Sequence, residues 1–181
     1  MKKNEWLRSI LFFLGVALIL ILLRSFVFTP VMVKGDSMDP TLQDGEHVIA
    51  LKNTEIKRFD IVTFPAPDEA GKNYIKRVIG LPGDSVSYKD DQLYINGKKF
   101  EEDYLQEYKD KLTDGAPLTN DFTMLDYFSS ETIPDGKILV LGDNRRISKD
   151  SRMIGLIDED AILGDVKFIF WPLNEIGTVK H

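Results

Sequence analysis

The hydrophobic and polar positions of the chain follow two patterns that divide near Pro30. Before this residue, an apolar stretch runs from Ile10 to Leu23 without a polar side chain. After it, short apolar runs and alternating apolar and polar residues are separated by turn-forming residues, and no long stretch follows the period of a helix. The pattern predicts an N-terminal helix followed by a body made mainly of β-strands.

The apolar stretch has the outline of a cleavable signal peptide or of a membrane anchor. Its 14 residues fit a signal peptide and fall short of the roughly 20 that cross a bilayer. However, residues 24–30 (RSFVFTP) contain no pair of small residues two apart, which a cleavage site requires. We therefore predict a retained transmembrane helix from about Trp6 to Phe28, with Arg24 reaching the lipid headgroups.

The charges around this helix predict its orientation and the domain boundary. Lys2, Lys3 and Arg8 precede the apolar stretch, whereas Arg24 and the more distant Lys34 follow it. Positive charge is retained on the cytoplasmic side of membrane helices. We therefore expect a single-pass protein of the cell membrane, with residues 1–29 as the cytoplasmic tip and anchor and residues 30–181 as a domain on the outer face.

Eight β-strands are predicted in the body. They are Val31–Val33, Glu46–Leu51, Phe59–Phe64, Tyr74–Ile79, Ser85–Tyr88, Gln92–Ile95, Lys137–Leu141 and Ala161–Trp171. Turn signals such as Asp44-Gly45, Pro82-Gly83-Asp84 and Asn96-Gly97 separate them, and Leu93–Lys99 has the pattern of a hairpin. Residues 99–130 are the exception: they are rich in Asp, Glu and Lys, contain a predicted helix from Phe100 to Lys111, and are interpreted as an inserted subdomain.

Composition narrows the possible functions. The chain has no cysteine, which excludes disulfides, thiolate metal sites and a cysteine nucleophile. Its net charge is −6, and residues 30–181 carry −9, which argues against a nucleic-acid partner. The histidines are His47 and His181, so a zinc site is not expected and a histidine-based serine triad would rest on His47 alone. The simpler interpretation of His47 is a strand residue.

Three segments contain residues that could take part in catalysis. Ser37 lies among turn-forming residues after a β run, where it could equally be an ordinary turn serine. Alternation turns Lys76 to the same face as Val78, and a lysine aimed at an apolar interior must find an anion or lose its proton, unless it reaches water from a strand end. A serine nucleophile needs a base, and a desolvated lysine can supply it. Residues 141–152 (LGDNRRISKDSR) fit a loop held by ion pairs or a solvated surface loop.

Taken together, these segments resemble the type I signal peptidases, the Ser-Lys enzymes that process secreted preproteins. The resemblance covers nearly the whole chain and rests on three motifs in order. They are Ser37-Met38 before Pro40-Thr41-Leu42, Lys76-Arg77 before Gly80–Asp84, and Gly142-Asp143-Asn144 before Ser148, Asp150, Ser151 and Arg152. The single anchor and small size are similar to the short enzymes of Gram-positive bacteria. The resemblance implies a signal-peptidase-like β domain that needs no metal or cofactor.

The resemblance also implies a role for each matching residue. Ser37 matches the nucleophile, Lys76 the general base, and Ser148 a serine that orients the lysine amine. A supporting set of ion pairs is matched by Asp143, Asp150, Arg77 and Arg152. The pocket for the residue before the cut is matched by Val33, Met38, Tyr74 and Ile75.

Gly35 departs from the pattern of many Gram-negative members. They carry a serine at this position, two residues before the nucleophile, and its hydroxyl helps to hold the oxyanion. With Gly35 the oxyanion must rely on backbone donors, which we expect to be the Ser37 amide and the Gly35 region.

The expected function is therefore cleavage of signal peptides from secretory preproteins at the bilayer, after Ala-x-Ala-like sites. Two alternatives remain at this point. One is a self-cleaving Ser-Lys domain of the kind found in SOS-response repressors, which are cytosolic and lack an anchor. The other is a membrane-tethered β module that only binds a partner, and such a module has no need for Ser37, Lys76 and Ser148 together.

Overall fold

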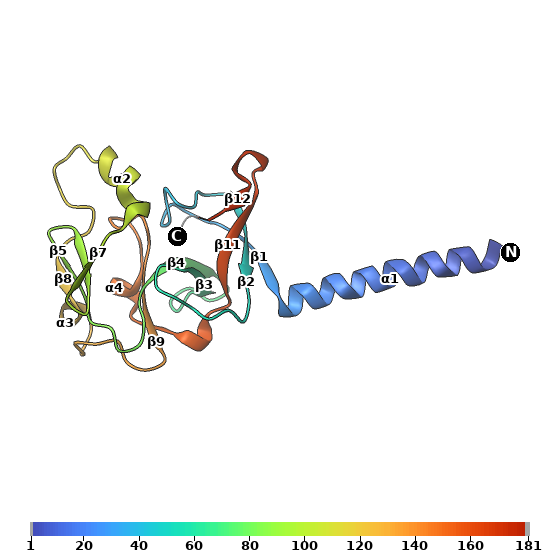
Figure 1. The fold of residues 1–181 in the computed structure, drawn as a ribbon, viewed down its shortest axis with the longest axis horizontal. Coiled ribbons are helices and arrows are strands. Elements are labelled where there is room, and N and C mark those ends of the chain that lie inside the picture. The colour runs from blue at the N-terminus through green and yellow to red at the C-terminus, as the bar shows by residue number, and fades with distance from the viewer. Residues whose placement is uncertain (1, 180–181) are drawn as a thin grey trace.

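The structure is a computed structural model that describes residues 2–179, with side chains from residue 5 onward. The side chains of Lys2 and Lys3 and all of His181, which the sequence analysis invoked, lie outside this part. Helix α1 spans Lys2–Phe26 and projects from a β-rich body (Figure 1). The predicted end at Phe28 is wrong, because Phe28 begins strand β1 (Phe28–Met32). Pro30 cannot continue a helix, and it biases the preceding residue towards an extended conformation.

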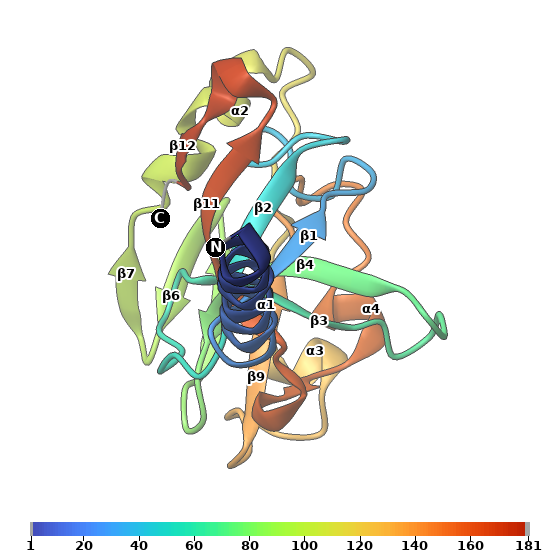
Figure 2. The ribbon, with the colours of Figure 1, turned by 90° about the vertical axis from the view of Figure 1, so that its right-hand side faces the viewer.

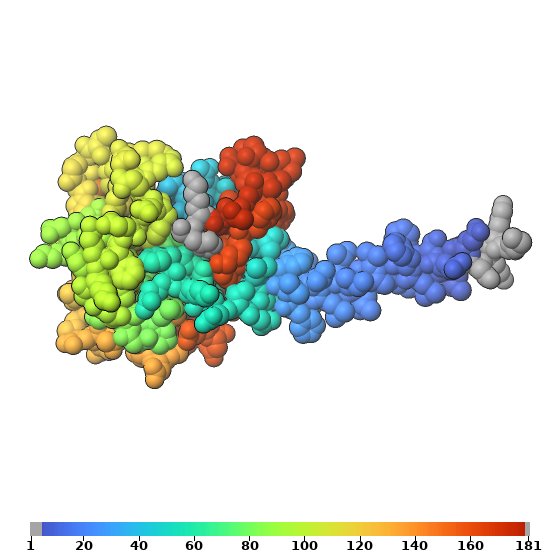
Figure 3. Space-filling model, in the orientation of Figure 1, coloured from blue at the N-terminus to red at the C-terminus, as the bar shows by residue number. Residues whose placement is uncertain are grey.

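Helix α1 makes few contacts with the body. Its segment Glu5–Phe26 is 22 residues long, and the most apolar part of this segment is not buried by the rest of the protein. The length and composition of the segment suffice to cross a membrane. At 1.5 Å per residue this segment measures about 33 Å, which matches the roughly 30 Å hydrocarbon core of a bilayer. Figure 3 shows the helix standing clear of the body, and Figure 2 shows it leaving from the side where β1 and β2 lie.

The larger of two sheets contains eight strands, most of them antiparallel neighbours far apart in sequence. Its strand order is β1-β2-β11-β3-β4-β9-β10, and β12 pairs with β11. Besides β1, the strands are β2 (His47–Leu51), β3 (Ile61–Pro65), β4 (Asn73–Gly80), β9 (Lys137–Leu141), β10 (Ile157–Asp158), β11 (Gly164–Trp171) and β12 (Gly177–Thr178). β1 lies at an edge of this sheet, directly after α1.

The second sheet has the order β7-β6-β5-β8. It consists of β5 (Val86–Lys89), β6 (Gln92–Ile95), β7 (Lys98–Phe100) and β8 (Phe122–Thr123). The predicted hairpin is confirmed: Asn96 and Gly97 join β6 to β7 with φ angles of 53° and 74°. Two consecutive residues with positive φ form the type of tight turn that Asn-Gly favours.

The remaining elements are short helices. They are the 3-10 helices η1 (Asp103–Leu105), η2 (Glu159–Ala161) and η3 (Leu173–Glu175), and the α-helices α2 (Gln106–Lys111), α3 (Met124–Tyr127) and α4 (Ser151–Ile154). The predicted helix from Phe100 to Lys111 is present only in part: Phe100 belongs to β7, Asp103–Leu105 form the 3-10 helix η1, and the α-helix covers Gln106–Lys111. The side chain of Gln92 holds the end of β7 by donating to the Phe100 carbonyl at 2.5 Å.

The mainly β architecture agrees with the prediction, although strand ends differ. All eight predicted strands are present. The predicted Ala161–Trp171 begins only at Gly164, since Ala161 belongs to η2, and the predicted Val31–Val33 is displaced towards α1 as β1. Residues 99–130 contribute to the interior as well as to the surface: Phe122 and Met124 pack in one apolar cluster with Leu139 of the larger sheet. The boundaries of an inserted subdomain remain a prediction.

Candidate active site

Ser37 lies in the loop that joins β1 to β2. The loop is closed at its base by the Val33 N–H, which donates to Glu46 O at 2.8 Å, and by the Gly35 N–H, which donates to Asp44 Oδ1 at 2.7 Å. Gly35 has a φ of +76°, a conformation that glycine adopts without strain. Beside Ser37, the Met38 side chain is buried in the core. Ser37 is thus presented from a loop fixed on both sides.

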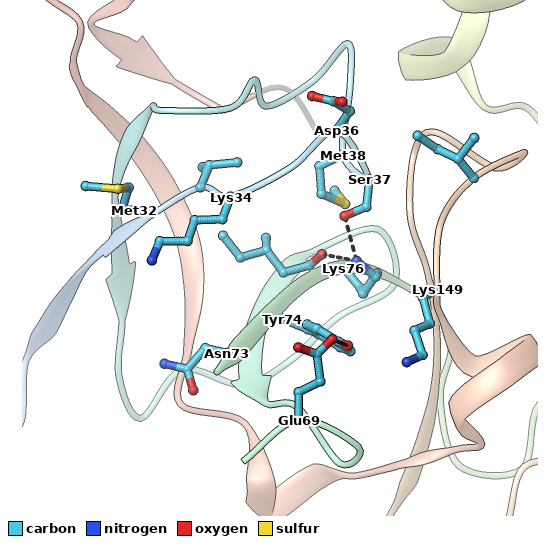
Figure 4. Close-up of a pocket in the computed structure, with 13 residues that line it drawn as sticks. Met32, Lys34, Asp36, Ser37, Met38, Glu69, Asn73, Tyr74, Lys76 and Lys149 are labelled. Carbon is cyan, nitrogen blue, oxygen red and sulfur yellow. Dashed lines mark hydrogen bonds between the residues drawn. The ribbon is translucent and has the colours of Figure 1, made fainter. Parts of the chain in front are cut away.

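Lys76 reaches Ser37 from strand β4. The lysine is 3% exposed, and its Nζ lies 2.7 Å from Ser37 Oγ and 3.0 Å from the carbonyl oxygen of Ile75 (Figure 4). The amine also lies 5.3 Å from the centre of the Tyr74 ring. The burial predicted from strand alternation is therefore confirmed, and the side chain does not escape to water. β4 brings together residues 39 positions apart.

Burial changes the protonation of this amine. Desolvation lowers the pKa of Lys76 to about 8, although the nearby carboxylates of Asp150 and Asp143 act in the opposite direction. An ammonium group loses more hydration than a neutral amine when both enter a low-dielectric site, which is why burial favours the neutral form. A neutral amine hydrogen-bonded to a serine hydroxyl can accept its proton.

One ion pair holds residues 142–152 against β4, where the resemblance implied a set of them. Arg77 of β4 and Asp143 form a two-pronged pair with N···O distances of 2.9 and 2.6 Å, and both side chains are fully buried. Asp150 accepts the Gly142 N–H at 3.0 Å and pairs with Arg152 within the loop. The loop therefore has one ion pair to the strand of Lys76 and one that stabilises its own turn.

Ser148 lies in this loop at a buried position, but its contacts differ from those the resemblance implied. Within residues 2–179 its Oγ has no hydrogen-bond partner, so the expected bond to the Lys76 amine is not formed in this structure. The hydroxyl lies close to Gly142: a Cβ added there would come within 2.1 Å of Ser148 Oγ and 2.4 Å of Ser37 O. Glycine at 142 thus lets the loop approach both serines.

A pocket of about 290 Å³ opens beside Ser37 and Lys76. All four residues predicted to surround the substrate line it: Val33, Met38, Tyr74 and Ile75. A second hollow, lined by Thr29, Pro30 and Val31 among others, shares several residues with the first and extends it along β1. The two together form a groove that runs from Ser37 along β1 towards the end of α1.

The two predicted oxyanion donors are main-chain N–H groups, those of Ser37 and Gly35, and their hydrogen bonds differ. In the part of the chain that the structure describes, no acceptor is bonded to the Ser37 N–H, so it is available to a ligand. The Gly35 N–H is instead bonded to Asp44. Of the two predicted donors, the structure leaves the Ser37 amide free.

Comparison with known proteins identifies the family. The sequence profile described as signal peptidase, peptidase S26, matches residues 3–171. The chain belongs to the signal peptidase family. It is 48% identical over 192 residues to signal peptidase IB of Staphylococcus aureus, an alignment that covers 100% of this chain and 95% of that protein. It is 47% identical to signal peptidase I of Bacillus licheniformis, over 97% and 94% of the two chains.

A solved structure supports the same assignment. The crystal structure of a signal peptidase I from Enterococcus faecalis matches with a TM-score of 0.59 and 43% identity, over 62% of this chain and 97% of that one. The chain is therefore a serine peptidase of the signal peptidase family. This result decides against both a self-cleaving repressor domain and a module that only binds.

His47, the histidine that a serine triad would have required, lies away from Ser37 in this signal peptidase family member. His47 is a half-buried residue of β2, its ring packs against Phe170 at 5.6 Å between centroids, and it does not line the pocket of Ser37. The interpretation as an ordinary strand residue is confirmed.

Contacts between residues 99–130 and the loop of residues 142–152 were not predicted from the sequence. Arg145 is buried and pairs with Glu102 at 2.6 Å. The Tyr108 hydroxyl donates to Asn144 Oδ1 at 2.7 Å, and the Asn144 N–H donates to Ser37 O at 3.1 Å. No signal in the sequence points to these pairs, because the partners lie 36 to 107 positions apart and polar residues are usually interpreted as surface.

Proposed function

We propose that this chain is a membrane-anchored endopeptidase that removes N-terminal signal peptides from exported preproteins, using Ser37 as nucleophile and Lys76 as general base. The observation that carries the proposal is the 2.7 Å contact between Lys76 Nζ and Ser37 Oγ, made by an amine whose pKa burial lowers to about 8. At that pKa about a tenth of the amine is neutral at pH 7, compared with well under a thousandth for an exposed lysine.

The proposed chemistry proceeds in two steps. Neutral Lys76 takes the proton of Ser37, and Ser37 Oγ bonds to the scissile carbonyl carbon. The C–N bond then breaks, and Lys76 returns the proton to the leaving amine. In the second step Lys76 takes a proton from water, and the hydroxide bonds to the carbonyl carbon of the acyl-enzyme ester. The bond from this carbon to Ser37 Oγ then breaks, and Lys76 returns the proton to Ser37 Oγ. In this proposal the Ser37 N–H, which has no acceptor in the described structure, donates to the oxyanion, whereas the bond from Gly35 to Asp44 makes the Gly35 amide a weaker candidate.

The substrate path in this proposal follows the edges of two strands. β1 is an edge strand, and β9 begins to pair with β4 only at Arg77, which leaves one edge of residues 73–75 unpaired in the described structure. An extended segment of preprotein can add between these edges as a further strand. Its side chains then alternate between the pocket and the other face. A pocket bounded by Met38, Tyr74 and Ile75 favours a small residue before the cut, in keeping with Ala-x-Ala.

The membrane placement is part of the same proposal. We infer that α1 stays attached and crosses the cell membrane once, with the N-terminus in the cytoplasm and the catalytic domain on the outer face. The end of a preprotein's apolar segment emerges at that surface. The acidic charge of residues 30–181 makes nucleic acid an unsuitable partner for this domain.

Cleavage of one preprotein by the full chain in detergent micelles tests the proposal. Ser37→Ala and Lys76→Ala should each abolish processing, because each removes one half of a nucleophile-base unit. Lys89→Ala is the matched control, since Lys89 is an exposed lysine of β5 outside the pocket. A folded Lys76→Ala enzyme that keeps more than a tenth of the wild-type rate would remove the lysine from the mechanism.

A further inference from the structure

Ile147 is an exposed aliphatic residue at the mouth of the pocket that contains Ser37. Its side chain is 63% exposed, and it lines the pocket together with Ser37 and Lys149. No step of the proposed chemistry uses it. Single exposed apolar residues are common on protein surfaces. Two features distinguish Ile147 from an ordinary exposed residue: the way its backbone is held, and the part of a substrate that can reach it.

The backbone around Ile147 is fixed. The N–H groups of Ile147 and Ser148 both donate to the Asn144 carbonyl, at 3.2 and 3.0 Å. Lys149 forms an ion pair with Asp68 in the loop between β3 and β4. A β-branched side chain on such a backbone has few rotamers. A ligand that contacts Ile147 therefore costs little conformational entropy, because the backbone and side chain of this residue are already ordered.

The groove determines which half of a substrate reaches Ile147. From Ser37 it continues along β1 past Val31 and Pro30, towards the end of the membrane helix. Ile147 lines the pocket at Ser37 but not this extension. Figure 4 shows Met32 and Lys34 to one side of Ser37 and Lys149 to the other. A substrate that enters from the membrane places the residues before the cut along β1, so the residues after the cut leave towards Ile147 and Lys149.

The positive charge of Lys149, which lines the pocket together with Ile147, is compensated. The ammonium group of Lys149 is paired with Asp68, so together they add no net charge. We propose that Ile147 contacts the first residue after the cleaved bond and that this contact favours an apolar side chain there. The proposal rests on the proposed function, because it takes Ser37 as the point of cleavage. Ile147 is then a specificity residue for the N-terminus of the mature protein.

The test uses two peptide substrates that differ only in the first residue after the cut, Leu or Gly, with the full chain in detergent micelles. The ratio of their kcat/KM values isolates the contact, because changes in the amount or general activity of the enzyme cancel. We expect wild type to prefer Leu by about fivefold, the effect of burying part of one aliphatic side chain. Ile147→Ser should reduce the ratio to near one by slowing cleavage of the Leu peptide.

Met153→Ser is the matched control. Met153 is also apolar and 71% exposed, it follows in the adjacent helix α4, and it does not line the pocket. Its replacement should leave the ratio unchanged. The inference is overturned if Ile147→Ser changes both substrates equally, if it changes neither, or if Met153→Ser alters the ratio as much. Failure of the proposed function would look different: wild type would cleave neither peptide, or Ser37→Ala would still cleave both.

Discussion

Replacing Lys76 with methionine should stabilise the folded protein at neutral pH, and the gain should shrink as the pH rises. Burial lowers the pKa of Lys76 from 10.5 to about 8. Below pH 8 the buried amine is charged in both the folded and the unfolded state, and its desolvation costs the folded state about 3 kcal/mol, at 1.36 kcal/mol for each pKa unit. Between pH 8 and pH 10.5 the unfolded state binds more protons, so the wild-type stability rises with pH and the penalty disappears.

The measurement is the melting temperature of wild type and Lys76→Met at pH 7 and pH 9.5. Lys76→Met also removes the hydrogen bonds to Ser37 and Ile75 and alters the packing. These effects change the stability of the variant by about the same amount at both pH values, so they do not contribute to the pH dependence. The stability gain of Lys76→Met over wild type should decrease by about 2 kcal/mol between pH 7 and pH 9.5. This change corresponds to roughly 4 to 8 °C in the difference between the two melting temperatures for a domain of this size. Lys89→Met, which removes an exposed charge, should show a small change. A stability difference for Lys76→Met that stays constant with pH would refute a depressed lysine pKa.

Three further predictions follow from the site. The acid limb of kcat/KM for wild type should lie near pH 8, and Tyr74→Ser, which admits water beside the amine, should move it to higher pH; a wild-type limb near pH 10 would contradict this. Asp143→Ala should lower the free energy of unfolding by about 3 to 5 kcal/mol, measured by denaturation, because it leaves the buried Arg77 uncompensated; exposed Asp135→Ala should change it little. Ser148→Ala should change the cleavage rate far less than Lys76→Ala does and should not lower the melting temperature, since its buried hydroxyl has no partner among residues 2–179; a lower melting temperature would indicate a structural role.

The longer strands were predictable from sequence because each is a short apolar run or an apolar-polar alternation bounded by turn residues. β7, β8, β10 and β12 have only two or three residues each, too few to show a period. The end of α1 was misplaced for a related reason. Phe26 and Phe28 are both apolar, and hydrophobicity alone does not distinguish a helix end from the first residue of a strand.

The site was predictable only in part. Local pattern predicted that Lys76 points inward, and the structure agrees. Its pairing with Ser37 depends on how β4 crosses the β1–β2 loop, which a local pattern does not contain. The buried contacts of Glu102 and Tyr108 were missed because a polar residue carries no sign in the sequence that a distant partner will cover it.

The short connection between α1 and β1 has a consequence for substrate length. The helix ends at Phe26 and the strand begins at Phe28, so no flexible linker separates α1 from the groove beside Ser37. A strand advances about 3.3 Å per residue, so the five residues of β1 span about 16 Å, and the loop that contains Ser37 begins at the far end of this strand. On the proposed path a preprotein runs beside β1 over this same interval. The length of β1 and of the short stretch after it then sets the distance from the membrane to the cut. This distance in turn sets the number of residues between a substrate's apolar segment and its cleavage site.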